Sequence, residues 1–314
     1  MSDPLVLRET IELGAVLTAQ EPAQVRGFAR DLEGAGFDSI WVGDHISFHV
    51  PILESLTLLS HVAAVTERVT LGTSVYLLPL RHPTTTAKVA ATVDHLSGGR
   101  LRLGVGVGGE FPPEFDASGV PVTERGSRAN EAIAVLRKLW SGERVEHEGR
   151  HFRFGPVQIA PPPVRAGGPP ILVGGRKAAA FRRAGRLGDG YISHMCSPDM
   201  YRQNLDEIRT HAAASGRRDV PFDTLAFVFT ILGDDYTACH KQAADLLQMI
   251  YARPFEEAAR KYCLLGRPAD CLEQMRRFVD AGCRGFILSP LMSPDEFLAR
   301  SREELLPALR DFRL

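Results

Sequence analysis

The sequence lacks the marks of several protein classes. Its five cysteines are scattered among 314 residues without a C-x-x-C pair, so it predicts neither a disulfide framework nor a zinc knuckle. No apolar run approaches the roughly 18 residues of a membrane helix. The first four residues, Met1-Ser2-Asp3-Pro4, lack the basic and then apolar order of a signal peptide. We therefore expect a cytoplasmic protein that does not enter a membrane.

The chain also carries almost no net charge. Lys and Arg number 37 against 38 Asp and Glu, which gives a formal charge of −1 and a pI of about 6.8. A protein that binds a nucleic-acid backbone needs clustered cations to neutralise phosphates. We expect a small-molecule partner rather than a nucleic acid.

Short apolar runs alternate with helical apolar stripes along most of the chain. Eight runs are predicted as strands, over residues 11–17, 39–42, 69–76, 101–107, 171–173, 190–193, 225–232 and 285–288. Helices are predicted from 23–35, around 56–63, and over 83–96, 124–140, 178–186, 199–214, 236–250, 270–281 and 294–309. Strands that alternate with helices favour a parallel sheet, and eight such units favour a closed (β/α)8 barrel. An open doubly wound sheet is the alternative.

One stretch departs from this rhythm, at about 110–170, and we interpret it as an insertion after strand four of a single domain spanning 1–314. It contains one clear helix and a polar segment, 145–154, that is expected to form a hairpin. Residues 155–170 hold six Pro and three Gly, which predicts an extended connector that returns to the barrel.

Active sites of such barrels lie at the carboxyl ends of the strands, and polar residues follow strand two there. Asp44 and His45 form a pair in which the imidazole can accept a proton. A helix cap beside a surface histidine is the simpler reading. With His49 four residues on, the pair could also form a metal site, although strand one lacks the H-x-H pattern of barrel metallohydrolases.

Glycine-rich turns follow strands four and five. Residues 104–109 match G-x-G-x-x-G, but we expect no helix at Pro112-Pro113, so the dinucleotide fingerprint is rejected. What remains is a loop that allows close backbone approach to a ring, with Glu110 as a proton donor or acceptor. Gly174-Gly175-Arg176 precedes a helix and predicts a site for a single phosphate. His194, after strand six, could line the same mouth or fill the barrel rim.

Several longer strings resemble the luciferase-like monooxygenase superfamily, in order and along most of the chain. They are Gly36-Phe37-Asp38-Ser39-Ile40-Trp41-Val42-Gly43-Asp44-His45, His82-Pro83, Ala90-Ala91-Thr92-Val93-Asp94-His95-Leu96-Ser97-Gly98-Gly99-Arg100, Gly104-Val105-Gly106-Val107-Gly108, Glu124-Arg125-Gly126, Val173-Gly174-Gly175 and Ala184-Gly185-Arg186-Leu187-Gly188-Asp189-Gly190. The resemblance implies a (β/α)8 barrel, often a homodimer, that binds the deazaflavin coenzyme F420 or reduced FMN. FMN-using members depend on a separate cofactor reductase and activate O2, whereas F420-using members transfer hydride.

Three positions favour the F420 branch. Ser74-Val75 is similar to the site where those enzymes hold a non-prolyl cis peptide against the ring. By the same resemblance, His45 would take a substrate hydroxyl proton, with Asp44 beside it, and Glu110 would manage a second proton. One departure is that alcohol-oxidising branches carry a Trp shortly after the His, whereas this chain reads Ile46-Ser47-Phe48-His49.

The resulting hypothesis is an F420-dependent oxidoreductase with His45 and Glu110 as catalytic residues and no metal. The residues expected to hold the cofactor are Asp44, Ser74, Val75, Gly106, Gly108, Gly109, Gly174, Gly175, Arg176 and His194. The alternatives are an FMNH2-dependent two-component monooxygenase, a metallohydrolase that uses Asp44, His45 and His49, and a cofactor-binding protein without turnover.

Overall fold

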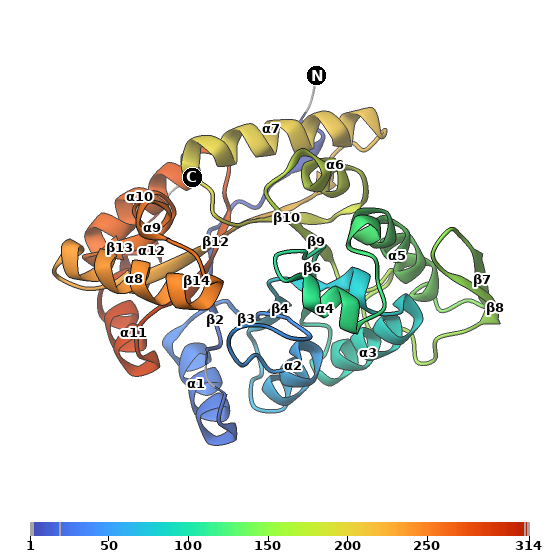
Figure 1. The fold of residues 1–314 in the computed structure, drawn as a ribbon, viewed down its shortest axis with the longest axis horizontal. Coiled ribbons are helices and arrows are strands. Elements are labelled where there is room, and N and C mark those ends of the chain that lie inside the picture. Colours follow the sequence, from blue (N-terminus) through green and yellow to red (C-terminus); the bar gives the residue numbers. More distant parts are fainter. Residues whose placement is uncertain (1–2, 19, 311, 313–314) are drawn as a thin grey trace.

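Eight parallel strands form a closed barrel in the computed structural model, which describes residues 3–18, 20–310 and 312 (Figure 1). Residues 1 and 2 of the segment examined for a signal peptide lie outside the described residues. In order around the barrel the strands are β2 (Glu12–Val16), β3 (Ser39–Val42), β4 (Thr70–Thr73), β6 (Leu101–Gly106), β9 (Ile171–Gly174), β10 (Gly190–Ser193), β12 (Asp223–Leu232) and β14 (Gly285–Pro290). Pairing of β10 with β12 and of β14 with β2 closes the ring. The predicted (β/α)8 barrel is confirmed, and the open sheet is excluded.

Helices cover the outside of this barrel. They are α1 (Pro22–Ala35), α2 (Ser55–Ala63), α3 (Pro83–Leu96), α5 (Arg125–Leu139), α6 (Ala178–Leu187), α7 (Pro198–Ala214), α8 (Tyr236–Tyr251), α10 (Pro268–Asp280), α11 (Pro294–Arg300) and α12 (Leu306–Arg310). Helix α1 shows why the sequence predicts them well. Pro22 occupies the first turn, an apolar stripe faces the barrel, and Gly36 ends the helix at a φ of 101°.

The segment between β6 and β9 differs from the prediction at its start. A short helix, α4 (Pro112–Ala117), begins at the Pro pair where we expected none. Proline fits the first turn of a helix because the N–H that it lacks has no partner there, and this outweighs the restriction that the second proline imposes on the first. The hairpin is confirmed as β7 (Val145–Glu148) and β8 (Arg153–Val157), and β8 takes three residues from the predicted connector.

Other boundaries differ for local reasons. The third predicted strand divides into β4 and β5 (Tyr76–Leu77) around a cis peptide between Ser74 and Val75. A helix α9 (Glu256–Tyr262) and a strand β13 (Leu264–Gly266) follow α8, and a short pair β1 (Leu5–Val6) with β11 (Val220–Pro221) lies outside the barrel; none of these was predicted. The last helix contains a π turn over 301–305, directly before Pro307, which lacks the N–H of a regular turn.

Trp41 fills the centre of the barrel. A Cβ added at Gly72 would lie only 2.2 Å from the Trp41 ring, and a Cβ added at Gly14 would lie 2.6 Å from its indole nitrogen. Gly72, in β4, therefore makes room for a core tryptophan. Further apolar side chains complete this inner cluster: Leu172, Ile192, Leu225 and Ile287.

A group of ion pairs lies at the amino ends of β2 and β12. The buried Glu12 carboxylate accepts hydrogen bonds from Arg102 at 2.7 and 2.9 Å and from Ser39 at 2.6 Å. Asp223 lies 3.5 Å from Arg102 and accepts a 2.6 Å hydrogen bond from Arg8. Burial by itself would raise the pKa of Glu12, but Arg102, Ser39 and Arg8 lower it overall.

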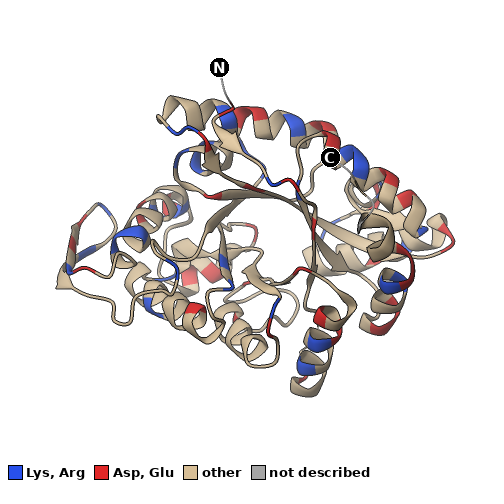
Figure 2. Cartoon of the chain, turned by 180° about the vertical axis from the view of Figure 1, so that it is seen from behind, with Lys and Arg blue, Asp and Glu red and all other residues tan. Residues whose placement is uncertain are grey.

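Charged residues of both signs occur on the outer helices (Figure 2). None of the helices in the described part of the chain is both long and apolar enough to cross a membrane.

Candidate active site

His45 is held by a carboxylate that sequence reasoning missed. It follows β3, and its Nδ1 lies 3.1 and 3.3 Å from the two carboxylate oxygens of Glu114, in the first turn of α4. Glu114 is 1% exposed and also accepts a hydrogen bond from the N–H of Ile46 at 3.2 Å. Because an ionised carboxylate only accepts, this contact places a proton on Nδ1 and leaves Nε2 as the nitrogen that can accept one. No described residue hydrogen bonds to Nε2.

Asp44 has a structural role instead of the predicted partnership with His45. Its carboxylate is 3% exposed and receives two hydrogen bonds from the Arg81 guanidinium, at 2.5 and 2.8 Å. The N–H of Leu77 and the hydroxyl of Ser55 donate at 2.8 and 3.1 Å. With four donors on two oxygens, Asp44 ties the loop after β3 to the loop after β4 and to α2.

Glu110 lies at the exposed rim of the barrel mouth. Its carboxylate accepts a 3.0 Å hydrogen bond from Arg176, and the two side chains are 43% and 37% exposed. The predicted proton group and the predicted phosphate ligand are thus brought together, on the side of the mouth formed by the loops after β6 and β9. The carboxylate beside His45 is the one four residues later, Glu114.

The Ser74-Val75 peptide is cis, as the resemblance implied, and lies directly after β4. The Val75 side chain occupies the space above two predicted glycines: a Cβ would lie 2.3 Å from a Val75 methyl at Gly106 and 2.6 Å from one at Gly174. These glycines therefore make room for Val75. The Ser74 Oγ is buried and has no hydrogen-bond partner among the described residues.

Gly108 and Gly109 pack against protein side chains. They adopt φ values of 58° and 100°, which glycine reaches without strain. A Cβ would lie 3.3 Å from Phe115 at Gly108 and 3.0 Å from Arg125 at Gly109. Their glycine identity is thus explained by the turn and by these neighbours.

The turn before α6 has the arrangement expected of an anion site. Gly175, at a φ of 145°, is held by the Tyr191 hydroxyl, which donates to its carbonyl at 2.9 Å. Asn204 in turn donates to the Tyr191 oxygen at 3.2 Å. The helix begins at Ala178 without a side-chain cap, so its first backbone N–H groups remain available for an anion beside Arg176.

His194 lies at the end of β10 among aromatic rings. The ring centroids of Phe227 and Phe229 are 5.4 and 5.9 Å from its own. Burial lowers the pKa of His194 to about 4, with further contributions from Arg176 and Arg253, so the ring is neutral at neutral pH. Its contacts are with these rings, and its role toward a cofactor stays a prediction.

The alternative metal site is not assembled. Asp44 is committed to Arg81, and the His49 ring lies 4.8 Å from that of Phe111. The described residues contain no group of three or more His, Cys, Asp and Glu side chains that could hold a metal ion.

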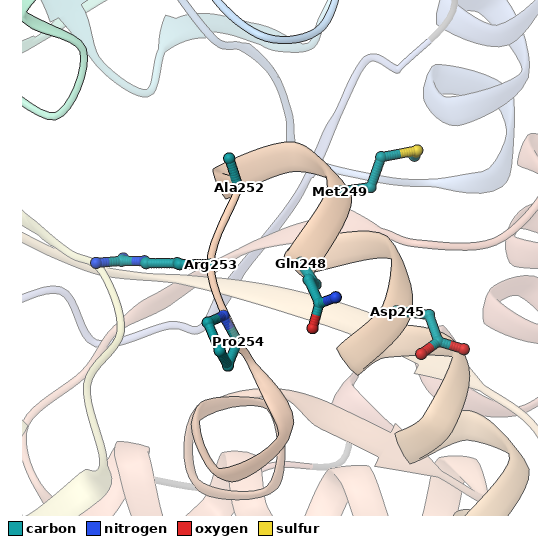
Figure 3. A pocket seen from close by; sticks show the side chains of 6 residues that line it. All are labelled: Asp245, Gln248, Met249, Ala252, Arg253 and Pro254. Atoms are coloured by element: carbon teal, nitrogen blue, oxygen red, sulfur yellow. The ribbon is translucent and has the colours of Figure 1, made fainter.

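A hollow of about 490 Å³ lies at the end of α8, and His45 does not line it (Figure 3). It is lined by Asp245, Gln248, Met249, Ala252, Arg253 and Pro254. The Asp245 carboxylate pairs with Lys241 at 2.6 Å, and the Arg253 side chain extends away from Met249 and Asp245. None of the predicted site residues lines this hollow.

Comparisons with known proteins agree with the fold and the motifs. The family model for luciferase-like monooxygenases matches residues 9–303. An F420-dependent glucose-6-phosphate dehydrogenase of Nakamurella multipartita is 30% identical over 96% of this chain and 97% of its own length, and one of Microbacterium testaceum is 31% identical over 92% and 94%.

Solved structures share the whole fold. An F420-dependent secondary alcohol dehydrogenase, solved with an F420-acetone adduct, superposes with a TM-score of 0.86 at 19% identity, over 96% of this chain and 100% of that one. Monooxygenase RslO1 from Streptomyces bottropensis gives a TM-score of 0.82 at 25% identity, over 95% and 99%. The family model covers residues 9–303, the relatives match over nearly their whole length, and the barrel is closed. This chain therefore belongs to the luciferase-like monooxygenase family.

Proposed function

We propose that this protein is an oxidoreductase that uses coenzyme F420 to move a hydride to or from a small organic substrate, with His45 as general acid/base. Relatives of about 30% identity over nearly the whole chain carry names that specify F420. The observation that carries the proposal within the structure is the Ser74 hydroxyl, which follows β4 beside the cis peptide and has no hydrogen-bond partner among the described residues.

The residues at the mouth fit such a cofactor. Val75 would contact the ring, the Ser74 hydroxyl would gain a partner, and Gly174, Gly175 and Arg176 with the uncapped start of α6 would hold the phosphate. When bound, F420 supplies hydride transfer at its deazaflavin ring. The protein supplies orientation and the proton.

His45 is the group that moves this proton. In the oxidative direction Nε2 takes the proton of a substrate hydroxyl while the carbon that bears this hydroxyl gives its hydride to the bound cofactor, and in the reductive direction Nε2 returns the proton to the carbonyl oxygen as the carbon receives a hydride. Glu114 is a positioning residue, because it holds the Nδ1–H tautomer. Glu110 was predicted as the second proton group; because Arg176 donates a hydrogen bond to it, we assign it to orienting Arg176 instead.

Partners and compartment belong to the same proposal. We assign a small organic substrate, a homodimer and the cytoplasm; a separate cofactor reductase would be a partner in the FMN alternative. The family resemblance supports the substrate and the homodimer, and five buried, unbridged cysteines suit a reducing compartment.

Titration with F420 and, in parallel, with FMN tests the cofactor. We expect F420 to bind with micromolar affinity, and Arg176→Ala to weaken it about tenfold through loss of a charge-assisted contact. Arg153→Ala, in the exposed hairpin, is the matched control and should leave the affinity unchanged. Micromolar binding of FMN without binding of F420 would overturn the cofactor assignment and favour the monooxygenase alternative.

A further inference from the structure

Aromatic side chains enclose the imidazole that the proposed function uses. The ring of Phe48 stacks on His45, with centroids 3.9 Å apart and planes 13° from parallel. Phe111 and Tyr251 meet Phe48 edge-on, at 6.0 and 6.1 Å. The space next to His45 is therefore bordered by flat apolar faces from the loops after β3 and β6 and from the end of α8.

This aromatic wall continues across the mouth. The Tyr251 ring lies 6.3 Å from that of Phe229, which lies 5.2 Å from that of Phe227, and both phenylalanines belong to β12. The neutral His194 ring faces the same two phenylalanines. Rings thus connect the loop after β3 with β10 and β12.

The loop beside His45 combines polar residues with exposed apolar side chains. The loop over 45–52 lines a hollow of about 420 Å³, a size typical of small-molecule sites. Ile46 and Leu53, in and next to this loop, are 47% and 43% exposed, although apolar side chains of this size gain free energy when they are covered.

Two arginines near the mouth already contact other side chains. Arg176 pairs with Glu110, and the Arg253 guanidinium lies 5.7 and 5.1 Å from the ring centroids of Tyr251 and Phe255. Both arginines lie on the His194 side, and the charged group in contact with His45 is the Glu114 carboxylate. A sugar phosphate whose hydroxyl met His45 would need a cation elsewhere in the mouth for its phosphate, but no described cation contacts the rings of Phe48 and Phe111, and Arg176 is already paired with Glu110.

We propose that the substrate is an uncharged molecule with an aromatic or fused-ring body, whose hydroxyl or carbonyl group meets His45, and that sugar phosphates are not substrates. The inference rests on the proposed function of His45 and separates this chain from the dehydrogenases that it resembles in sequence. Phe48, Phe111 and Tyr251 would determine the specificity by stacking on the ring body.

Binding of a neutral fluorescent aromatic amine, N-phenyl-1-naphthylamine, tests the inference without turnover. We expect saturable binding at one site, weakened at least about threefold by Phe48→Ala, as for loss of one aromatic contact. Phe111→Ala, at a half-buried loop position, should weaken it similarly. Phe154→Ala, the same substitution in the β7–β8 hairpin, should leave it unchanged.

Glucose 6-phosphate provides the opposing arm. At millimolar concentration it should neither displace the probe nor release measurable heat on addition to the F420-loaded protein. Displacement of the probe by glucose 6-phosphate, or a probe affinity that Phe48→Ala and Phe111→Ala leave unchanged, would overturn the inference. Binding of the probe and its displacement need no F420, so a failed cofactor assignment gives a different result from a wrong substrate class.

Discussion

The replacement Glu114→Gln tests which carboxylate serves His45. The side chain keeps its shape and one acceptor oxygen but loses its negative charge and the second acceptor. The His45 Nδ1–H and the Ile46 N–H both donate to Oε2, so a glutamine oxygen there could keep them only as weaker bonds to an uncharged acceptor, while the second contact of Nδ1, at 3.3 Å, would meet a new N–H2 group. Glu110→Gln, four residues earlier, is the matched control because it removes the same charge from the exposed rim.

The structure gives different magnitudes for the two variants. A hydrogen bond to a charged group contributes about 1.5–3 kcal/mol, and Glu114 is 1% exposed, so solvent cannot replace the lost partner. We expect the free energy of unfolding to fall by about 2 kcal/mol, equivalent to roughly 3–6 °C in the midpoint of thermal unfolding. The half-exposed pair of Glu110 with Arg176 contributes about 0–1 kcal/mol, so its variant should unfold near the wild-type midpoint.

The tautomer of His45 distinguishes a positioning role from a purely structural one. In protein labelled with ¹⁵N-histidine, the two-bond ¹H–¹⁵N spectrum of the 10 histidines should show His45 with its proton on Nδ1, identified by its loss in His45→Asn. Glu114→Gln should alter this pattern and Glu110→Gln should not. An unchanged His45 spectrum together with an unchanged midpoint in Glu114→Gln would refute the assignment.

Two further predictions concern the floor of the mouth and the base of the barrel. In Gly174→Ala the new Cβ would lie 2.6 Å from a Val75 methyl and push it toward the cofactor. We expect titration of the folded variant to show F420 affinity at least about tenfold lower. An unchanged affinity would mean that Val75 does not contact the ring. Glu12→Gln leaves Arg102 without its nearest carboxylate and should cost about 3 kcal/mol at neutral pH. The folded-state pKa of Glu12 is lowered from its usual 4.5, so the stability it contributes is complete above that pH and is lost as the pH falls through the lowered value. Denaturation curves of wild type and variant should therefore converge in acid. A constant difference in stability down to acid pH would contradict this.

Local chemistry in the sequence was enough for the barrel and for most of its helices. Apolar spacing with Pro22 at one end and Gly36 at the other predicted α1, and the same patterns repeated eight times predicted a closed barrel with its site at the strand ends. The same rule placed His45, Ser74 and Arg176 at one mouth. These features depend on residues close together in the chain, which is why a single sequence carries them.

Partner choice depended on the tertiary structure. Asp44 adjoins His45 in the chain, yet successive side chains point apart, and Asp44 turned toward Arg81. Glu110 was predicted as a proton group because it ends the glycine-rich loop. In the structure α4 brings Glu114 to the imidazole, and this carboxylate was missed because no helix was predicted at the Pro pair. A Pro-Pro-Glu start of a helix was the signal available.

The glycines show the same division. Their positions after the strands were plain in the sequence, and they were interpreted as space for a ligand. In the folded chain Gly106 and Gly174 make room for Val75. The sequence alone thus determined where the backbone needed no side chain; only the closed barrel, which brings strands far apart in the chain within contact distance, decided which atoms occupy each space.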